Sequence, residues 1–188
     1  MLNPLDIAED EIIDQCKNGS LKYQEILYKH FYRYAMGISM RYSLDSDDAL
    51  EVVNDAFIKV FNHIKGYNND KPFKAWLRTI VVNTSIDRRR KELKHQLHID
   101  IDHAVQVQSS AKAIENLHVQ DIMKLMKELP PIQLTIFNMY EMDGYSHDEI
   151  ASILNMPASS SRVYLSRAKE KLRSLIISET KNNVRTIG

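Results

Sequence analysis

The residues best suited to chemistry lie in one run that starts at Phe73 and ends at Lys91. Phe73 and Trp76 follow a loop, Asn83 comes next, and the cationic cluster 88–91 closes the run. Aromatic rings stack on bases, amides hydrogen-bond to base edges, and cations neutralise phosphates. This order of residue types is what a groove for single-stranded nucleic acid requires, although Trp76 taken alone is typical of a core residue.

A second candidate site is the stretch 145–173. Ser146 and Glu149 form a capping box, which opens a short helix, and Asn155 and Pro157 favour a tight turn at its end. We expect the next helix to begin at a serine cap and to keep its basic residues off its buried stripe. The residues concerned are the caps Ser159 or Ser160, the buried Leu165, Ala168 and Leu172, and the basic Arg162, Arg167, Lys169, Lys171 and Arg173.

Two short helices joined by a tight turn, with a basic second helix, are typical of a helix-turn-helix that enters the major groove of DNA. The alternative is an ordinary helical hairpin with a solvated basic face. The small Ala151, the turn at Asn155 and the basic second helix occur together, and this combination favours DNA binding.

Length and charge limit the kind of protein this is. The 188 residues suit one or two small domains, and 44% hydrophobic with 27% charged residues is typical of a globular chain. The formal net charge is zero, but acids crowd residues 6–14 and 45–55 while bases crowd 74–94 and 162–173. Such a chain can offer one surface to a protein and another to phosphate.

Cysteine content and the first residues bear on location. Cys16 is the single cysteine, so no intramolecular disulfide is possible, and MLNPLDIAEDE lacks the basic-then-apolar pattern of a secretion signal. The longest apolar runs, such as 79–82, are too short to span a bilayer. We therefore expect a cytoplasmic protein with no direct membrane insertion.

Periodic apolar residues, with only 5 Gly and 5 Pro, predict an all-α protein. His30 is expected to be a core or boundary histidine, and the tail after Ile177 is expected to fray. A loop is predicted at 66–72. Besides the two helices of 145–173, helices are expected at 9–17, at 20–41 with Ser20 as cap, from 46 onward, at 73–91, at 114–128 and at 132–142.

Polar residues line one edge of the helix that starts at residue 46. Asp48, Glu51, Asn54 and Asp55 lie opposite the predicted apolar stripe and are mostly acidic. A solvated helix face explains them, and so does a docking edge for a basic partner. The sequence leaves both interpretations open.

The segment 95–113 reads as a polar linker between domains. His95, His98 and His103 lie in it with two aspartates, but no cysteine or i, i+4 pair fixes a metal geometry, so we expect no metal site and no cofactor. A metal-dependent hydrolase that uses these histidines is one alternative function. Because no HExxH, nucleophile motif or Gly-rich phosphate loop is present, we expect no enzyme activity.

DALEVVNDAFIKVF, FKAWLRTIVVNTSIDRRRK and the module 145–173 resemble the bacterial sigma factors of the extracytoplasmic-function (ECF) group of the sigma-70 family. The resemblance covers roughly residues 21–94 and 114–176. It implies two small helical domains joined by a flexible linker. These are a region 2-like helical bundle at 1–94, the linker at 95–113, a region 4-like helix-turn-helix domain at 114–177 and a polar tail at 178–188.

The resemblance implies a transcription initiation factor that binds core RNA polymerase and directs it to specific promoters, with no catalytic residue of its own. By position, Asp48, Glu51, Asn54 and Phe57 would bind the coiled coil of the polymerase β′ subunit. The family usually has Gln in place of Asn54. The β subunit would be a further contact.

The same resemblance implies that the loop 67–70 captures a base flipped from the promoter −10 element, with Asn83 beneath it. Flipping costs a few kcal/mol of stacking, which couples recognition to strand opening. The cationic run 88–91 would hold adjacent phosphates. The expected −10 contacts are Tyr67, Asn68, Asn69, Asp70, Phe73, Trp76, Arg78, Asn83, Arg88, Arg89 and Arg90.

The helix-turn-helix would read the −35 element as duplex DNA. The matching positions are Ser160, Arg162, Val163, Ser166 and Arg167, and an arginine placed on guanine gives ~1–3 kcal/mol of discrimination. Ser159 replaces a common Gly and Ser161 replaces a buried Val. A hydroxyl at Ser161 loses apolar burial of order 1 kcal/mol unless it bonds to a backbone carbonyl.

Further partners follow from the resemblance. An anti-sigma factor that wedges between the two domains is expected. The serine-rich start of the recognition helix also suggests an accessory DNA-bound factor that supplies the promoter address. The main rival is a helix-turn-helix repressor with a ligand-sensing first domain, but the sequence offers neither a dimer interface nor a pocket.

Overall fold

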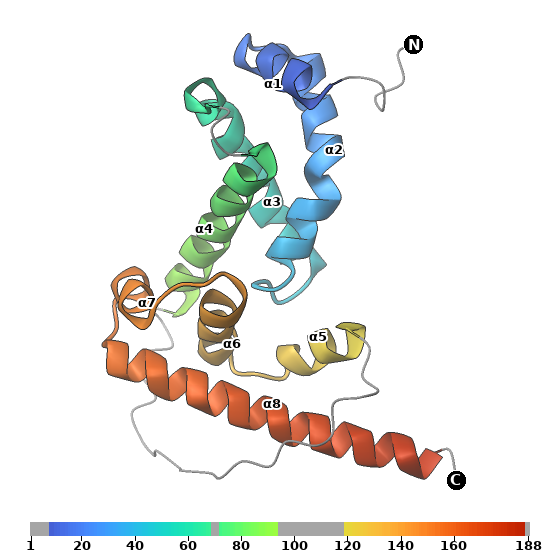
Figure 1. The fold of residues 1–188 in the computed structure, drawn as a ribbon, viewed down its shortest axis with the longest axis vertical. Coiled ribbons are helices and arrows are strands. Elements are labelled where there is room, and N and C mark those ends of the chain that lie inside the picture. Colours follow the sequence, from blue (N-terminus) through green and yellow to red (C-terminus); the bar gives the residue numbers. More distant parts are fainter. Residues whose placement is uncertain (1–7, 69–71, 94–118, 187–188) are drawn as a thin grey trace. The chain divides into compact units, whose positions relative to one another are not determined.

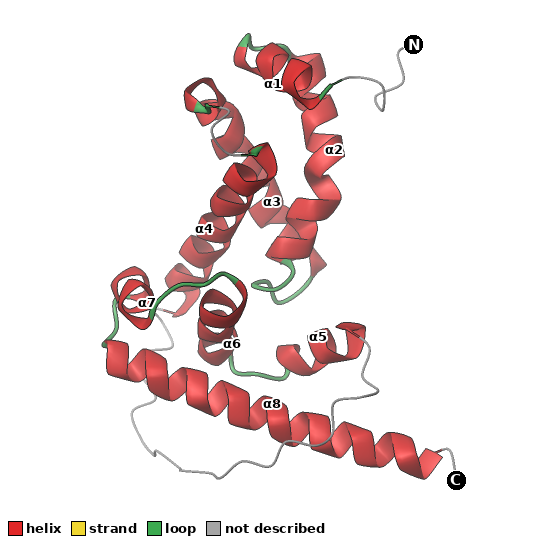
Figure 2. Cartoon of the chain, in the orientation of Figure 1, coloured by secondary structure: helices red, strands yellow, loops and turns green. Residues whose placement is uncertain are grey.

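The computed structural model describes residues 8–68, 72–93 and 119–186, and every regular element within them is a helix (Figure 2). The all-α prediction is confirmed. The chain divides into two compact units, Met1–Arg88 and Arg89–Gly188. The linker predicted at 95–113 lies outside the described residues, so the domain boundaries stay a prediction.

The first unit begins with α1 (Glu9–Lys17), whose end is set by the turn at Asn18 and Gly19. Gly19 has φ +82°, which glycine adopts without strain, and its N–H donates to the carbonyl of Cys16 at 2.9 Å. After α1 come α2 (Leu21–Ser39), α3 (Ser46–His63), the 3-10 turn η2 (Ile64–Gly66) and α4 (Phe73–Leu93) (Figure 1).

Helices α2, α3 and α4 bury apolar stripes that repeat every three or four residues, as the sequence predicted. Fully burying one large aliphatic or aromatic side chain stabilises the fold by about 1.5–3 kcal/mol, so these stripes decide how the helices pack. Their buried members are Leu27, Phe31, Ala35 and Ile38 of α2, Ala49, Val52, Val53, Ala56, Phe57 and Val60 of α3, and Phe73, Leu77, Val81, Val82 and Ile86 of α4.

The second unit contains α5 (Val119–Lys127), α6 (Pro131–Phe137), α7 (His147–Leu154) and α8 (Ala158–Thr186). Pro131 occupies the first turn of α6, one residue before the predicted start, because its missing N–H costs nothing there. Helix α6 continues as the π-helical turn η3 (Asn138–Met142), which the sequence did not predict. Helix α8 packs against α5, α6 and α7. Part of this core consists of Met126, Leu129, Ala168 and Leu172, with Ile122, Leu125, Leu134 and Phe137 packed around them.

Three expectations about α2 were wrong. His30 is exposed, because the buried stripe is a narrow line through Leu27 and Phe31 that leaves His30 outside it. The helix also ends at Ser39 instead of residue 41, and Ser20 precedes it without a side-chain capping bond.

Both ends of α8 differ from the sequence prediction. The helix begins at Ala158, and the carbonyl of Pro157 accepts the N–H of Ser161 at 3.2 Å, so the predicted serine cap was wrong. The helix continues to Thr186, beyond the predicted end at Ile177. Residues 178–186 contain neither proline nor glycine, so nothing in the sequence terminates the helix there.

None of the helices in the described ranges combines the length and the apolar character needed to cross a bilayer.

Candidate functional site

Helix α3 carries a continuous exposed face opposite its buried stripe. Leu50, Glu51, Asn54, Asp55 and Ile58 are exposed, and their spacing of three or four residues gathers them on one side of the helix. Leu50 is 37% exposed and Ile58 58%. The sequence analysis missed both, although apolar residues off the buried stripe were visible in the sequence. We call these five residues the α3 face.

Asn54 is held in place by a residue of α2. Its Oδ1 accepts the hydroxyl of Tyr28 at 2.9 Å, and the Tyr28 ring packs on Phe57 with centroids 4.7 Å apart. Burial, with a smaller contribution from Tyr32, raises the pKa of Tyr28, which keeps this hydroxyl a donor. Phe57 itself is 2% exposed. It therefore supports the α3 face from beneath, and any role in docking is indirect.

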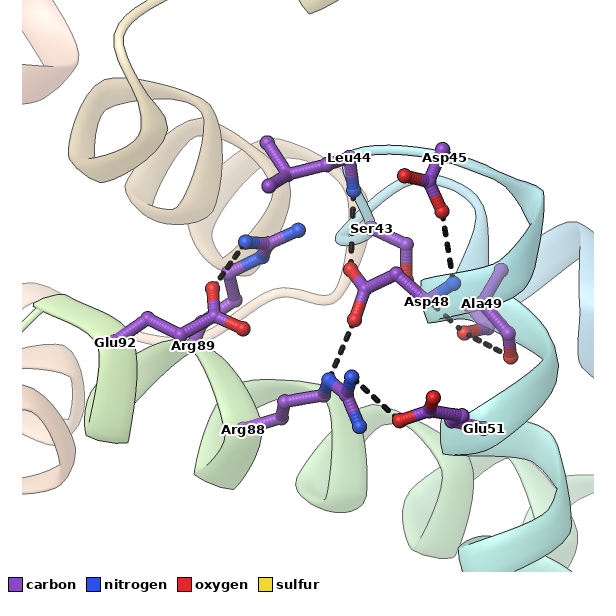
Figure 3. Close-up of polar contacts among 10 residues, drawn as sticks. Ser43, Leu44, Asp45, Asp48, Ala49, Glu51, Arg88, Arg89 and Glu92 are labelled. Carbon is purple, nitrogen blue, oxygen red and sulfur yellow. Dashed lines mark hydrogen bonds and ion pairs between the residues drawn. The ribbon is translucent and has the colours of Figure 1, made fainter.

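Asp48 belongs to the N-terminal cap of α3 (Figure 3). Its N–H donates to Oδ1 of Asp45 at 2.9 Å, and its own Oδ2 accepts the N–H of Leu44 at 3.1 Å. These bonds satisfy donors that a helix start would otherwise leave without partners. With its side chain only 12% exposed, Asp48 is a structural acid more than a surface one.

Arg88 of α4 bridges two acids of α3 (Figure 3). Its Nε lies 2.5 Å from Oδ1 of Asp48, and its Nη2 lies 2.7 Å from Oε2 of Glu51. The hydrogen bond to Glu51 is the largest of the effects that raise the pKa of Arg88, with Asp48 adding to it. An arginine predicted to hold DNA phosphate and two acids predicted to bind polymerase are therefore partners of one another.

Lys59 of α3 also contacts α4, through Thr84 and Asp87. Its Nζ donates to Oγ1 of Thr84 at 3.1 Å and lies 3.8 Å from Oδ2 of Asp87. Both contacts pair a residue of α3 with a residue of α4. Together with Arg88 they tie the polar sides of the two helices together.

The aromatic residues near the predicted −10 loop form a cluster. The Tyr67 ring contacts those of Phe73 and Trp76, with centroids 5.4 and 5.1 Å away, and Nζ of Lys17 lies 5.6 Å from its centroid. Tyr67 is 8% exposed and Phe73 1%, whereas Trp76 is half-buried. Tyr67 and Phe73 thus serve chiefly as core, and Trp76 is the aromatic of this trio with surface available for stacking.

The remaining predicted −10 residues occupy varied positions. Asn68 and Asn83 are exposed, Arg78 and Arg90 are half-buried, and Arg89 pairs with Glu92 one turn along α4. Asn69 and Asp70 lie outside the described residues. The structure therefore brings the helical members of the set onto α4 but does not describe the loop between Asn68 and Pro72.

The helix-turn-helix predicted at 145–173 has the expected local geometry. Ser146 Oγ accepts the N–H of Glu149 at 3.2 Å, and the Glu149 carboxylate accepts the N–H of Ser146 at 2.8 Å, which completes the capping box. These bonds lower the pKa of Glu149, chiefly through the backbone N–H of Ser146. Asn155 has φ 54° and ψ 54°, the left-handed conformation that the sequence predicted.

Three of the predicted −35 residues lie on the exposed side of α8. Arg162, Val163 and Ser166 are exposed, Val163 to 40%, whereas Ser160 and Arg167 are half-buried. They occupy the first three turns of the helix, where a recognition helix meets base edges. Three of the five predicted residues are thus accessible from solvent, and their contact with DNA stays a prediction.

Ser161 is fully buried, and its partner is a histidine in place of the backbone carbonyl that the sequence suggested. Its Oγ shares a hydrogen bond of 2.9 Å with Nδ1 of His147. The His147 ring stacks on Tyr140 with centroids 4.5 Å apart. Lys169 lies over the same tyrosine and pairs with Glu141 at 2.6 Å. This polar cluster joins η3, α7 and α8.

Neither a metal site nor a reactive thiol is found in the described ranges. They hold no group of three His, Cys, Asp or Glu side chains able to bind a metal. The linker histidines 95, 98 and 103 lie outside those ranges. Cys16 is buried, and burial raises its pKa to about 11, so its thiol stays protonated and unreactive at neutral pH.

Comparison with known proteins matches both units. Residues 27–94 match the family Sigma-70 region 2, and residues 119–172 match Sigma-70, region 4. The chain is 21% identical over 176 residues to the RNA polymerase sigma-H factor of Pseudomonas aeruginosa, covering 87% of this chain and 91% of that protein. It is 25% identical over 179 residues to the ECF RNA polymerase sigma-E factor of Escherichia coli K12, covering 88% and 93%.

Two solved structures are also similar. CnrH in complex with the cytosolic domain of CnrY has a TM-score of 0.46 at 18% identity, covering 89% of this chain and 96% of that one. The sigma factor RpoE in complex with the anti-sigma factor NepR, from Bartonella quintana, has a TM-score of 0.47 at 21% identity, covering 80% and 94%.

The fold and the two sites define an all-helical DNA-binding protein whose second unit is a helix-turn-helix. The chain belongs to the sigma-70 family, in its ECF group. It is a transcription initiation factor that directs RNA polymerase to promoters, and it is not an enzyme.

Proposed function

We propose that the α3 face is the surface by which this protein docks on core RNA polymerase, at the coiled coil of the β′ subunit, with the β subunit as a further contact. The observation that carries this proposal is the composition of the face. Two exposed aliphatic side chains, Leu50 and Ile58, flank Asn54, and Glu51 and Asp55 border them. Exposed aliphatic groups placed beside an amide and carboxylates are a composition found at protein interfaces.

Deleting residues 43–63 should abolish binding to core enzyme, because it removes the whole α3 face. The measurement is a pull-down of the full chain and the deletion variant with core RNA polymerase. A finer pair of variants, Leu50→Asp and Ile58→Asp, keeps the buried stripe of α3 intact, since both side chains are exposed. Retained binding by the doubly substituted chain would exclude the α3 face as the docking surface.

The −10 element is assigned to the first unit. Promoter strands that separate there would pass the loop 67–70 and the start of α4, with Trp76 stacking on a base and Asn68 and Asn83 bonding to base edges. The half-buried state of Trp76 and the exposure of both asparagines support this. Permanganate footprinting of thymines in the holoenzyme–promoter complex measures the opening, and Trp76→Ala should reduce it.

The −35 element is assigned to α8, whose exposed Arg162, Val163 and Ser166 would enter the major groove. The linker would lead toward the RNA exit path and be displaced by the nascent transcript. Run-off transcription with core enzyme and purified chain tests the whole assignment. A repressor would form a dimer and fail to support initiation.

Two further partners and a location complete the proposal. An anti-sigma factor is expected from the ECF resemblance, and a DNA-bound accessory factor is the second candidate because the recognition helix starts with serines. The place of action is the cytoplasm, where RNA polymerase works. Robust, sequence-specific transcription from isolated promoter DNA with core enzyme alone would exclude the accessory factor.

A further inference from the structure

The guanidinium of Arg88 is already engaged on two sides. Its Nε and Nη2 each lie within 2.7 Å of a carboxylate oxygen, one from Asp48 and one from Glu51. Contacts this close between a guanidinium and two carboxylates are strong charged interactions. Two carboxylates around one guanidinium leave a net negative charge at this point, which repels a phosphate.

Asp48 could not leave this arrangement without loss elsewhere. Its second oxygen accepts the N–H of Leu44, and its backbone N–H is capped by Asp45 (Figure 3). Because Asp48 caps the start of α3, its ion pair with Arg88 holds α4 against the first turn of α3. Arg88 is thus linked to the helix that carries the α3 face.

Glu51 differs from Asp48 in its exposure. Its side chain is 66% exposed against 12% for Asp48, and one of its oxygens, Oε2, receives Arg88. Glu51 therefore presents a carboxylate to solvent with its conformation already restricted. Side-chain ordering is a cost of every interface, so a restricted acid binds a basic partner better than a mobile one.

We propose that Arg88 is a positioning residue of the polymerase-docking face, acting through Glu51, and that it does not hold promoter phosphate. This inference rests on the docking function proposed for the α3 face. It divides the cationic run 88–91 in two. Arg88 orders the surface that docks on polymerase, and other basic residues of the run contact phosphate. Arg90 is the residue with which Arg88 is compared below.

Two measurements on the full chain separate these roles. The first is the Kd of each labelled variant for core RNA polymerase, read by fluorescence anisotropy. The second is the salt dependence of binding between holoenzyme, assembled at saturating sigma, and a single-stranded −10 oligonucleotide. Each phosphate contact with single-stranded DNA contributes about 0.7 to the slope of log K against log salt concentration.

Arg88→Ala should weaken core binding about fivefold and leave the salt slope unchanged. Arg90→Ala should lower the slope by about 0.7 and leave core affinity unchanged. Lys29→Ala, which breaks an exposed ion pair of 2.6 Å to Glu25 on α2, is the matched control and should change neither. Arg88→Lys, which can pair with only one carboxylate at a time, should give an intermediate Kd.

A double-mutant cycle tests the route through Glu51. Glu51→Gln keeps the Asp48–Arg88 pair and so the helix start, and in this background Arg88→Ala should weaken core binding less than twofold. A full fivefold effect there would refute positioning through Glu51. Tighter core binding by Arg88→Ala, or a lower salt slope, would also overturn the proposal.

The experiments distinguish failure of the docking proposal from failure of the role proposed for Arg88. If the Leu50→Asp, Ile58→Asp chain still binds core enzyme, the α3 face is not the docking surface. If that chain loses binding while Arg88→Ala binds like the parent chain, only the role proposed for Arg88 is wrong. Circular dichroism of each variant reports whether the helices have formed, and Arg88→Lys and Glu51→Gln replace Arg88→Ala should that variant not fold.

Discussion

Removing the hydroxyl of Ser161 should destabilise the second unit by about 1 kcal/mol. The hydroxyl is fully buried and shares a 2.9 Å hydrogen bond with Nδ1 of His147, so Ser161→Ala removes one bond and leaves that nitrogen without this partner. A buried group left unsatisfied costs about 1–3 kcal/mol, and the low end applies because His147 is half-buried. For a domain of 60–100 residues, 1 kcal/mol lowers the melting temperature by roughly 4–8 °C.

The assay must report on the second unit. The single tryptophan, Trp76, lies in the first unit, so its fluorescence does not follow α7 and α8. Differential scanning calorimetry, with hydrogen exchange of peptides from α7 and α8, does. Ser152→Ala, at an exposed serine of α7, is the matched control and should unfold like the parent chain. The same result for Ser161→Ala would refute the energetic role of this bond.

The same pair gives stability a pH dependence of known sign. Burial and the nearby Arg162 and Lys169 lower the pKa of His147 from its ordinary 6.5, while Asp148 opposes them. Well above pH 6.5 the His147 ring is neutral in both the folded and the unfolded states, and its interactions contribute fully to the free energy of unfolding. As the pH falls below 6.5 the unfolded state takes up the proton first, so the free energy of unfolding decreases. His147→Phe should abolish this part of the slope, and an unchanged slope would assign it to another group.

Three further predictions concern separate features. Ser146→Ala should cost about 1 kcal/mol of stability in the second unit by removing the helix cap. It should raise the pKa of Glu149 only part of the way to its ordinary value, because the backbone N–H of residue 146 still donates to the carboxylate, and NMR titration measures this pKa. Cys16, 2% exposed and with its pKa raised to about 11, should react with Ellman's reagent only as fast as the first unit opens. Arg162→Ala should weaken discrimination at one −35 base pair by ~1–3 kcal/mol, which competition binding with single-base variants would detect.

Features set by neighbours in sequence were the ones that could be predicted. The capping box of Ser146 and Glu149 and the left-handed Asn155 depend on residues within one helical turn, and both are present. The buried stripe of α3 follows from periodicity alone. Local chemistry therefore gave the helices, the turn of the helix-turn-helix and the all-α class.

Features set by residues far apart in sequence could not be predicted in this way. Tyr28 bonds to Asn54 across 26 positions, and His147 bonds to Ser161 across 14. Nothing in either pair's local sequence specifies the other member. The exposure of His30 was missed for a related reason, since the width of a buried stripe depends on how closely neighbouring helices approach.

The charge pattern shows the same limit, because contacts between helices decide which charges are paired. Acids at 45–55 and bases at 74–94 suggested two surfaces, one for a protein and one for phosphate. In the fold, Arg88 joins Asp48 and Glu51, and Lys59 lies beside Asp87, so part of each charged run neutralises the other across α3 and α4. Charge that is paired inside a unit attracts an outside partner less strongly, although Glu51, with its side chain 66% exposed, still presents a carboxylate to solvent. In the docking that we propose, the free energy therefore comes largely from the exposed aliphatic groups of the α3 face. Raising the salt concentration should then weaken core binding much less than it weakens binding to promoter DNA, because screening acts on exposed charges and counterion release accompanies phosphate contacts.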